Sequence, residues 1–317
     1  MSSTLVTGAG GQLGSELVAA LRKQTDAASV VALDLTSPAA ADGPTETADV
    51  RDRAALTRIV SAHEVHTIYH LASLLSATGE QFPDRTWDVN MAGLKNVLDL
   101  ARDRNVRVFW PSSIAVFGPS TPTPAPQRTT LDPATIYGVT KRSGELLCQY
   151  YHRRYGLDVR SLRLPGLLSH RTPPGGGTTD CAVEMYRHAA RSIDYDCFLR
   201  SDTTLPLMYM PDALRAIRGL MAADADALSV RDSYNVSGFS ASPQQIAESI
   251  RPHVSAFSCT YTPDARQQIA DTWPAAVDDT TARRDWDWAP AHDLDATTQD
   301  MLVHLTADER ESGNVDA

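Results

Sequence analysis

Short apolar runs rich in β-branched residues alternate with amphipathic stretches over the first half of the chain. In the stretches Leu13–Arg22 and Trp87–Arg104 apolar residues recur every three or four positions, which indicates helices. This alternation predicts an α/β fold, with a Rossmann-like doubly wound parallel sheet covered by helices on both faces. The predicted strands are Thr4–Val6, Val30–Leu33, Thr67–His70, Val106–Trp110 and Asp158–Leu162.

The pattern changes after Pro165, where the proline- and glycine-dense segment HRTPPGGGTTD opens a region with longer helical patterns. We therefore expect a nucleotide-binding domain over residues 1–165 and a smaller, mainly substrate-binding C-terminal lobe over residues 166–309. The polar residues 310–317 are expected to form a frayed tail. The segment Gly118–Pro133 contains five prolines and is predicted to be a surface loop.

Charge and composition exclude several classes of protein. The chain has 29 basic and 39 acidic residues and a net charge of −10, whereas a nucleic-acid-binding protein needs a basic surface. No apolar run approaches the roughly 18 residues of a membrane span, and the first residues do not resemble a secretory signal. The four cysteines lie far apart in the sequence, and we therefore expect them to be reduced thiols. We expect a cytoplasmic protein that binds neither nucleic acid nor membranes.

A glycine-rich turn follows the first predicted strand. Gly8, Gly11 and Gly14 have the spacing G-x-x-G-x-x-G between this strand and the first predicted helix. Such glycines permit a tight turn and a close approach of the backbone to a pyrophosphate, which then lies at the helix N-terminus. The segment therefore predicts a dinucleotide site.

The identity of the dinucleotide follows from Asp34, which ends the second predicted strand, twenty residues after Gly14. A carboxylate at this position accepts hydrogen bonds from the adenosine ribose and repels a 2′-phosphate, which predicts NAD as the cofactor. Asp49 and Val50 follow at the place where an adenine ring would lie.

A second constellation concerns the chemistry. Tyr137 and Lys141 lie four residues apart and share one face of a predicted helix. The ammonium should lower the phenol pKa, so that the tyrosine can act as a general base. Ser112 and Ser113 end the preceding strand and offer a hydroxyl for the substrate oxygen. The pattern S-x-x-x-[YF]-G favours Ser113, whereas the usual spacing to the tyrosine favours Ser112.

The glycine turn, the strand-end serines and the Tyr-x-x-x-Lys pair together resemble the short-chain dehydrogenase/reductase superfamily, in particular its extended, epimerase-like branch. The HLAS tetrapeptide at His70 and the helix containing Asn90 fit that branch. GGGTTD and IADTWP in the second half are more specific. They resemble segments of the short-chain-type NAD-dependent L-threonine 3-dehydrogenases, and the resemblance covers residues 4 to about 305.

This resemblance implies a set of residues for each ligand. The implied NAD contacts are Gly8, Gly11, Gln12, Leu13, Gly14, Asp34, Asp49, Val50, Leu71, Ala72, Ser73, Asn90, Tyr137, Lys141 and Leu164. The implied L-threonine contacts are Ser76, Ser113, Tyr137, Gly177, Thr178, Thr179, Asp180 and Trp273. Leu164 and Cys181 depart from the family pattern, which usually has tyrosine at both places.

The resemblance also implies a reaction and an assembly. We expect an oxidoreductase of threonine catabolism that oxidises the 3-hydroxyl of L-threonine to give L-2-amino-3-oxobutanoate and NADH, with Tyr137 as general base. A homodimer would form through the helices that contain Asn90 and Tyr137, and a segment near residues 206–236 would return to the first domain. Two alternatives stay open: an NAD-dependent nucleotide-sugar epimerase and a non-enzymatic NAD-sensing regulator.

The GGGTTD segment suits a small amino acid, because three glycines let the chain pass close to a ligand. Asp180 could pair with the ammonium of the substrate, hold the glycine loop in shape, or cap the helix that follows.

A metal site is not expected. His63, His66 and His70 are close in sequence but belong to a loop and to a buried strand, so they are not predicted to meet on one surface.

Overall fold

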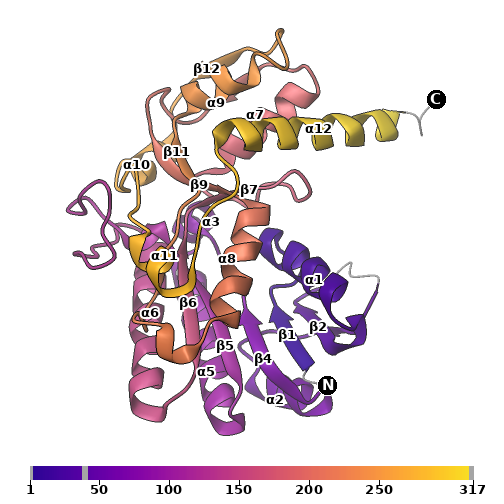
Figure 1. The fold of residues 1–317 in the computed structure, drawn as a ribbon, viewed down its shortest axis with the longest axis vertical. Coiled ribbons are helices and arrows are strands. Elements are labelled where there is room, and N and C mark those ends of the chain that lie inside the picture. The colour runs from indigo at the N-terminus through magenta and orange to yellow at the C-terminus, as the bar shows by residue number, and fades with distance from the viewer. Residues whose placement is uncertain (1–2, 38–41, 314–317) are drawn as a thin grey trace.

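The computed structural model describes residues 3–37 and 42–313, with the backbone alone given for residues 310–313. A seven-stranded parallel sheet forms the centre of the larger domain (Figure 1), in the order β10-β6-β5-β4-β1-β2-β3. Its strands are β1 (Ser3–Thr7), β2 (Val30–Asp34), β3 (Thr45–Thr47), β4 (Val65–His70), β5 (Arg107–Ser113), β6 (Val159–Leu164) and β10 (Tyr234–Asn235). The predicted doubly wound α/β fold is confirmed. The sequence pattern missed the two edge strands, β3 and β10, because they have only three and two residues.

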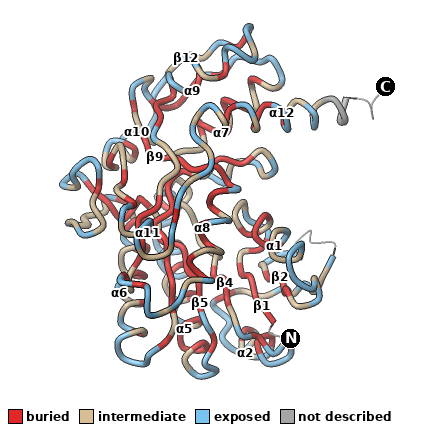
Figure 2. The backbone as a smooth tube through the Cα atoms, in the orientation of Figure 1, coloured by how far each residue is buried: buried red, intermediate tan, exposed pale blue. Residues whose placement is uncertain are grey.

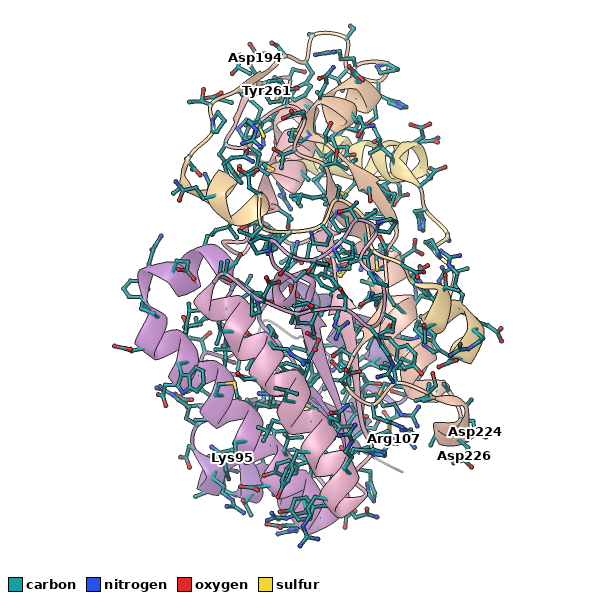
Figure 3. The ribbon with its side chains drawn as sticks, turned by 90° about the vertical axis from the view of Figure 1, so that its left-hand side faces the viewer. Lys95, Arg107, Asp194, Asp224, Asp226 and Tyr261 are labelled. Atoms are coloured by element: carbon teal, nitrogen blue, oxygen red, sulfur yellow. The ribbon has the colours of Figure 1, made fainter. Side chains whose placement is uncertain are left out.

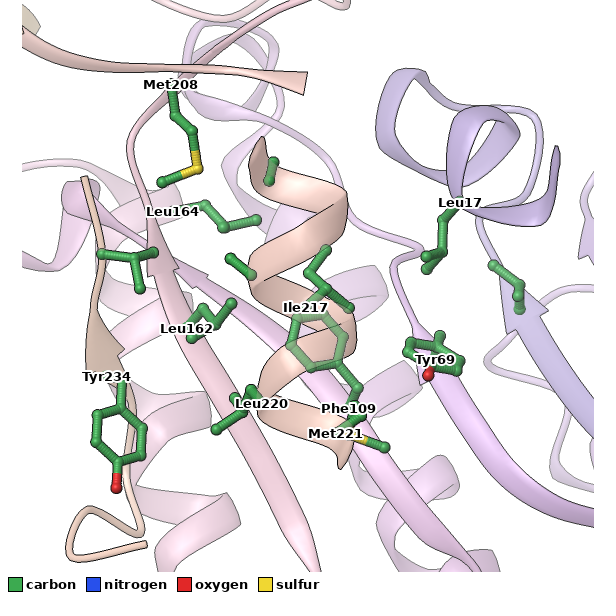
Figure 4. Close-up of a cluster of buried hydrophobic side chains, with 14 of the residues drawn as sticks. Leu17, Tyr69, Phe109, Leu162, Leu164, Met208, Ile217, Leu220, Met221 and Tyr234 are labelled. Carbon is green, nitrogen blue, oxygen red and sulfur yellow. The ribbon is translucent and has the colours of Figure 1, made fainter. Parts of the chain in front are cut away.

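Helices cover both faces of this sheet. Consecutive strand residues point to opposite faces, so Val6 packs in the cluster beneath α1 and α8, whereas Leu5 packs beneath α2, α5 and α6. Figure 4 shows the first cluster, in which Ile217 of α8 lies beside Phe109 and Leu162 of the strands. These helices are α1 (Gln12–Gln24), α2 (Arg53–Ala62), α5 (Gly93–Arg104), α6 (Ile136–Tyr155) and α8 (Met210–Ala222).

The predicted helix Trp87–Arg104 differs in one detail. It consists of the end of α4 (Pro83–Trp87), a wider π-helical turn η2 (Asp88–Ala92) and α5. Such turns insert an extra residue into a helix and re-aim a side chain. Here the turn contains Asn90, which is buried and points at the loop after β4.

The second half of the chain forms a smaller lobe with its own apolar core, at the upper end of the molecule in Figure 1. It has a three-stranded sheet of β7 (Gly166–Leu168), β9 (Leu205–Tyr209) and β11 (Phe239–Ala241) and a two-stranded sheet of β8 (Tyr195–Cys197) and β12 (Cys259–Tyr261). The surrounding helices are α7 (Asp180–Ala190), α9 (Pro243–Ile250), α10 (Ala265–Ala270) and α12 (Leu294–Gly313).

Two features of the second half bear on its predicted organisation. α8 and β10, within residues 206–236, lie on the large sheet, as does α11 (Thr280–Trp286). α12 continues over residues 310–313, where a frayed tail is expected, and the rest of that tail, residues 314–317, lies outside the described residues. Figure 2 shows that burial is continuous along the central strands, whereas the outer helix faces are exposed.

The topology fixes where a ligand can bind. β1 has β2 on one side and β4 on the other, and Thr7 is in register with Leu33 and His70. The strand order reverses at this point, which in open α/β sheets leaves a crevice at the carboxyl ends of the strands. The residues that follow these three strands therefore meet at one edge, below the smaller lobe (Figure 1).

Candidate active site

The turn between β1 and α1 brings two stretches of backbone into direct contact. Gly8 has a φ of +70°, and a Cβ on it would lie 2.6 Å from the amide nitrogen of Ala72. A Cβ on Gly14 would lie 2.0 Å from the Gly8 carbonyl oxygen. Neither position can therefore hold a larger residue without moving the backbone.

Three observations fit this turn to a dinucleotide. Gly11 stands at the N-cap of α1 and has no side chain to cap it, which leaves the helix N-terminus to a ligand. The Nε2 atom of Gln12 is buried and has no hydrogen-bond partner among the described residues. The Asp34 carboxylate accepts hydrogen bonds from the amides of Gly10 at 2.8 Å and Leu35 at 2.7 Å, which fixes it beside the turn.

The loop after β4 is held in place by Asn90. Its Oδ1 accepts a hydrogen bond from the Leu74 amide at 2.9 Å, and its Nδ2 donates to Thr140 of α6 at 3.1 Å. Asn90 is therefore a support for the loop and for α6. Asp49, expected near the adenine, forms an ion pair with Arg51 at 2.6 Å.

Tyr137 and Lys141 lie on the buried face of α6, next to the end of β5. The Nζ atom of Lys141 donates a hydrogen bond to the Pro111 carbonyl at 2.7 Å and lies 5.4 Å from the centre of the Tyr137 ring. The Ser113 hydroxyl lies beside the Tyr137 phenol, and both side chains line the same cavity. The phenol, the ammonium and one hydroxyl thus face one cavity.

Burial dominates the electrostatics of this pair. It raises the pKa of the Tyr137 phenol to about 12, against the opposing effect of the Ser113 hydrogen bond. It also lowers the pKa of the Lys141 ammonium to about 7. In the protein alone, desolvation is thus the main cause of both pKa shifts, and the effect that opposes it at Tyr137 comes from Ser113.

The two neighbouring serines have different surroundings. Ser112 is buried, and its hydroxyl donates to the Glu145 carboxylate at 2.7 Å, away from the cavity. Ser113 lines the cavity beside Tyr137, and its hydroxyl accepts a hydrogen bond from the Ala115 amide at 3.2 Å. This geometry favours the assignment of Ser113 as the hydroxyl that meets the substrate.

The opposite wall of the cavity comes from the smaller lobe and from α3 (Ser76–Gln81). The hydroxyls of Ser76 and Thr178 are 3.1 Å apart and both buried. The Asp180 carboxylate accepts hydrogen bonds from the amides of Gly176 at 2.8 Å and Gly177 at 2.7 Å, so it shapes the glycine loop. Burial raises the pKa of the Asp180 carboxyl, and these two amides oppose that shift.

The cavity has a volume of about 360 Å³ and extends from the glycine turn to the GGGTTD segment. Among the described residues that line it, Lys141 is the only lysine or arginine and Asp180 the only carboxylate. The lining residues predicted from the sequence are Gly8, Gly11, Gln12, Leu13, Gly14, Leu71, Ser73, Ser76, Ser113, Tyr137, Lys141, Leu164, Gly177, Thr178, Thr179, Asp180 and Trp273.

Some expected residues lie elsewhere, and some lining residues were missed. The expected residues that do not line the cavity are Asp34, Asp49, Val50, Ala72, Asn90 and Ser112. Nine of the described residues line it without having been predicted: Leu74, Leu75, Thr78, Pro111, Ile114, Pro165, Gly166, Leu167 and Gly175. Each lies within three positions of a predicted residue along the chain, and this closeness was the only available signal.

The two departures from the family pattern have unequal weight. Leu164 lines the cavity, so it can affect a ligand directly. Cys181 lies in the apolar core of the smaller lobe, next to Cys197. Cys181 does not line the cavity.

The three histidines are separated. Nδ1 of His70 is 2.8 Å from the Thr7 hydroxyl, and burial lowers the pKa of His70 to about 3. Nε2 of His63 lies 2.9 Å from a carboxylate oxygen of Glu46, so His63 has a different partner from His70. Among residues 3–37 and 42–309, whose side chains are described, no cluster of three or more potential ligands could hold a metal ion.

Comparison with known proteins places this geometry in a family. The sequence model of the NAD dependent epimerase/dehydratase family matches residues 4–237. An uncharacterized epimerase/dehydratase of Staphylococcus saprophyticus is 44% identical over an alignment 316 residues long, which covers 98% of this chain and 99% of that relative. The chain belongs to the NAD dependent epimerase/dehydratase family, and the prediction of NAD as cofactor is confirmed at this level.

Solved structures narrow the similarity further. The holo form of a GalE-like L-threonine dehydrogenase from Cupriavidus necator is 48% identical, has a TM-score of 0.94, and is matched over 96% of this chain and 99% of that one. A monomeric L-threonine 3-dehydrogenase from a metagenome is 45% identical, with a TM-score of 0.93 and coverage of 96% and 99%.

The position of Asp34 predicts the choice between NADH and NADPH. A 2′-phosphate would meet this carboxylate, and like charges in contact cost several kcal/mol. We expect NADH to bind at least about tenfold more tightly than NADPH in a fluorescence titration. Asp34→Asn keeps the size of the side chain but removes its charge, so the difference between the affinities for NADH and NADPH should become smaller. Equal affinities of the unaltered protein for both dinucleotides would contradict the assignment.

Proposed function

We propose that this protein is an NAD-dependent L-threonine 3-dehydrogenase, which oxidises the 3-hydroxyl of L-threonine to give L-2-amino-3-oxobutanoate and NADH. One observation carries the proposal. Tyr137 and Ser113 face a small cavity whose opposite wall is the Ser76 and Thr178 pair with the glycine loop. The similarity to solved L-threonine dehydrogenases over 96% of the chain supports it.

Tyr137 is the proposed general base. NAD⁺, when bound, accepts a hydride from the carbon that carries the hydroxyl. The phenolate of Tyr137 removes the hydroxyl proton, and Ser113 donates a hydrogen bond to the same oxygen. Lys141 would stabilise the phenolate by its charge, and its Nζ, which donates to the Pro111 carbonyl, would be available to the nicotinamide ribose of a bound NAD. Since burial holds the phenol pKa at about 12, this step depends on positive charge brought next to the ring.

Neutral donors would recognise the amino-acid part of the substrate. The hydroxyls of Ser76 and Thr178 suit a carboxylate, because each can donate a hydrogen bond to it. The Asp180 carboxylate offers the only negative charge among the described lining residues for the ammonium. Its two hydrogen bonds to the loop keep it in position.

The alternatives fit the cavity less well. A nucleotide-sugar epimerase must bind a second diphosphate, and Lys141 is the only lysine or arginine among the described lining residues. An NAD-sensing regulator would not need Tyr137, Lys141 and Ser113 in contact. Release of NADH in step with threonine consumption distinguishes the dehydrogenase from both.

A cytoplasmic location and a small-molecule partner complete the proposal, in keeping with the net charge of −10. None of the helices in residues 3–37 and 42–313 has the length and apolarity to cross a membrane. The division into a nucleotide-binding domain over residues 1–165, rejoined by α8 and β10, and a substrate-binding lobe over the rest follows from where the two ligands would lie.

A homodimer is part of the same proposal. Trp87, Val139, Leu146 and Tyr150 are exposed around α4 and α6. These helices lie with α5 on the side of the large domain that faces the viewer in Figure 3, where Lys95 of α5 is labelled. Exposed apolar side chains grouped on neighbouring helices favour a protein interface.

Tyr137→Phe removes the ionisable oxygen and keeps the ring. We expect kcat for threonine to fall by at least about a hundredfold, while the dissociation constant for NADH stays within about threefold. Stopped-flow absorbance of NADH and a fluorescence titration measure the two quantities. In the same assay Ser113→Ala should reduce kcat more than Ser112→Ala. Near-normal turnover by Tyr137→Phe would exclude this tyrosine as the base.

Asp180→Ala removes both the charge and the two hydrogen bonds to the glycine loop. The expected result is a rise in KM for threonine or a fall in kcat of at least about tenfold, with little change in NAD affinity. Asp180→Asn keeps one hydrogen-bond acceptor and separates loop shape from charge. Unchanged threonine kinetics in a folded Asp180→Ala variant would limit Asp180 to a structural role at the start of α7.

The dimer is tested by placing a charge on its proposed interface. Leu146→Lys should convert a dimer to a monomer in sedimentation equilibrium, because a buried ammonium without a partner is costly. Val303→Lys is the matched control, since Val303 is also an exposed apolar residue but lies on α12. A monomeric unaltered protein, or a Leu146→Lys dimer of unchanged affinity, would contradict the assignment of this face.

A further inference from the structure

A buried ion pair lies directly behind the catalytic side chains. Glu145 of α6 and Arg163 of β6 are 0% and 1% exposed. Nε of Arg163 donates to Oε1 of Glu145 at 2.7 Å, and its second terminal nitrogen donates to Oε2 at 2.9 Å. The pair does not line the cavity, so it has no part in the chemistry proposed above.

Glu145 is one of three evenly spaced residues of α6 that contact the end of β5. Three successive residues of β5 contact three residues of α6 that are four positions apart: Ser113 meets Tyr137, Pro111 meets Lys141, and Ser112 meets Glu145. These α6 residues share one helix face, so fixing the third contact fixes the register of the other two.

The packing between α6 and β5 leaves little room for adjustment along this face. A Cβ on Gly144 would lie 2.4 Å from the Trp110 ring, so the helix backbone rests on the strand. The Nζ atom of Lys141 lies 4.8 Å from the centre of the same ring. A small slide or rotation of α6 would therefore move Tyr137 and Lys141 relative to Ser113.

The other end of the pair reaches the wall that carries Trp273. Arg163 donates to Oδ1 of Asn235 at 3.1 Å. Nδ2 of Asn235 donates to the carbonyls of Ala125 and Asp278 at 3.2 Å each. The stretch from Trp273 to Asp278 is thereby tied to the large domain, and Trp273 lines the cavity.

We propose that Ser112, Glu145 and Arg163 form a positioning element for the reaction, which sets the register of α6 on β5 and so aligns Tyr137 and Lys141 with Ser113. The inference rests on the proposed function. It assigns Ser112 a role distinct from that of its neighbour: its hydroxyl orients the Glu145 carboxylate and never touches the substrate.

A purely structural ion pair is the competing interpretation. Buried ion pairs often add little to stability, and apolar residues of similar volume can replace them without loss of the fold. Replacing both partners therefore removes the positioning contacts without leaving a buried charge unpaired. Glu145→Leu combined with Arg163→Met is such a double variant, and Ser112→Ala removes the third member alone.

The matched control lies on the same helix. The Tyr151 hydroxyl donates to the buried Asp99 carboxylate at 2.6 Å, near the opposite end of α6 from Tyr137. Tyr151→Phe, like Ser112→Ala, deletes one hydrogen bond to a buried carboxylate. It leaves the contacts with β5 intact. Circular dichroism and thermal unfolding establish that each variant is folded before its kinetics are compared.

We expect Ser112→Ala to lower kcat about threefold or more and the double variant about tenfold or more, with KM for threonine changed less than kcat. The rise of kcat with pH should move to higher pH in both, because a misaligned Ser113 and Lys141 stabilise the phenolate less. The affinity for NADH should fall at least about twofold, since Lys141 is displaced. Tyr151→Phe should match the unaltered protein in all of these measurements.

Two results would overturn the inference. One is a folded double variant with the kcat, pH profile and NADH affinity of the unaltered protein. The other is an equal effect of Tyr151→Phe. Should the double variant not fold, Ser112→Ala against Tyr151→Phe decides the question. An unaltered protein without threonine-dependent NADH formation would refute the proposed function, and the NADH affinities would then test the positioning element alone.

Discussion

The parallel pairing of β1, β4 and β5 is the constraint on which the site depends. Because these strands run in one direction, their carboxyl ends lie at one edge of the sheet. Gly8, Leu71 and Ser113 are consequently brought together although they are far apart in the sequence. The close contact of Gly8 with the backbone at Ala72 shows how little space separates the two strand ends. A ligand held by one of these segments is therefore within reach of the others.

The packing that creates the cavity also sets its electrostatics. Tyr137 and Lys141 are buried against β5, and burial favours the neutral form of each: the pKa of the phenol is about 12 and that of the ammonium about 7. In the protein alone, Tyr137, the proposed general base, is thus mainly protonated at neutral pH. A cationic cofactor changes this balance, because opposite charge at close range in a desolvated site favours the phenolate. Proton removal would then be coupled to occupation of the dinucleotide site.

The sequence predicted the elements with strong local patterns and failed where the structure depends on distant partners. Five β-branched runs and the glycine turn were sufficient for the large sheet. The strand β10 has two residues and exists only because it pairs with β6, so no local pattern could reveal it. The lobe strands β7 and β9 pair with each other across 36 intervening residues. Such pairing depends on tertiary contacts, which a single sequence does not display.

The choice between Ser112 and Ser113 shows the same limit at a single residue. Two spacing rules gave different answers, because the proline-rich loop before α6 changes the distance along the chain to Tyr137. In the structure, alternate residues of β5 point to opposite sides, so only one of two adjacent serines can face the cavity. Ser113 does, whereas Ser112 points at Glu145. Strand geometry therefore favours Ser113 as the hydroxyl that meets the substrate, and Ser112, which points away from the cavity, contacts the helix that carries Tyr137.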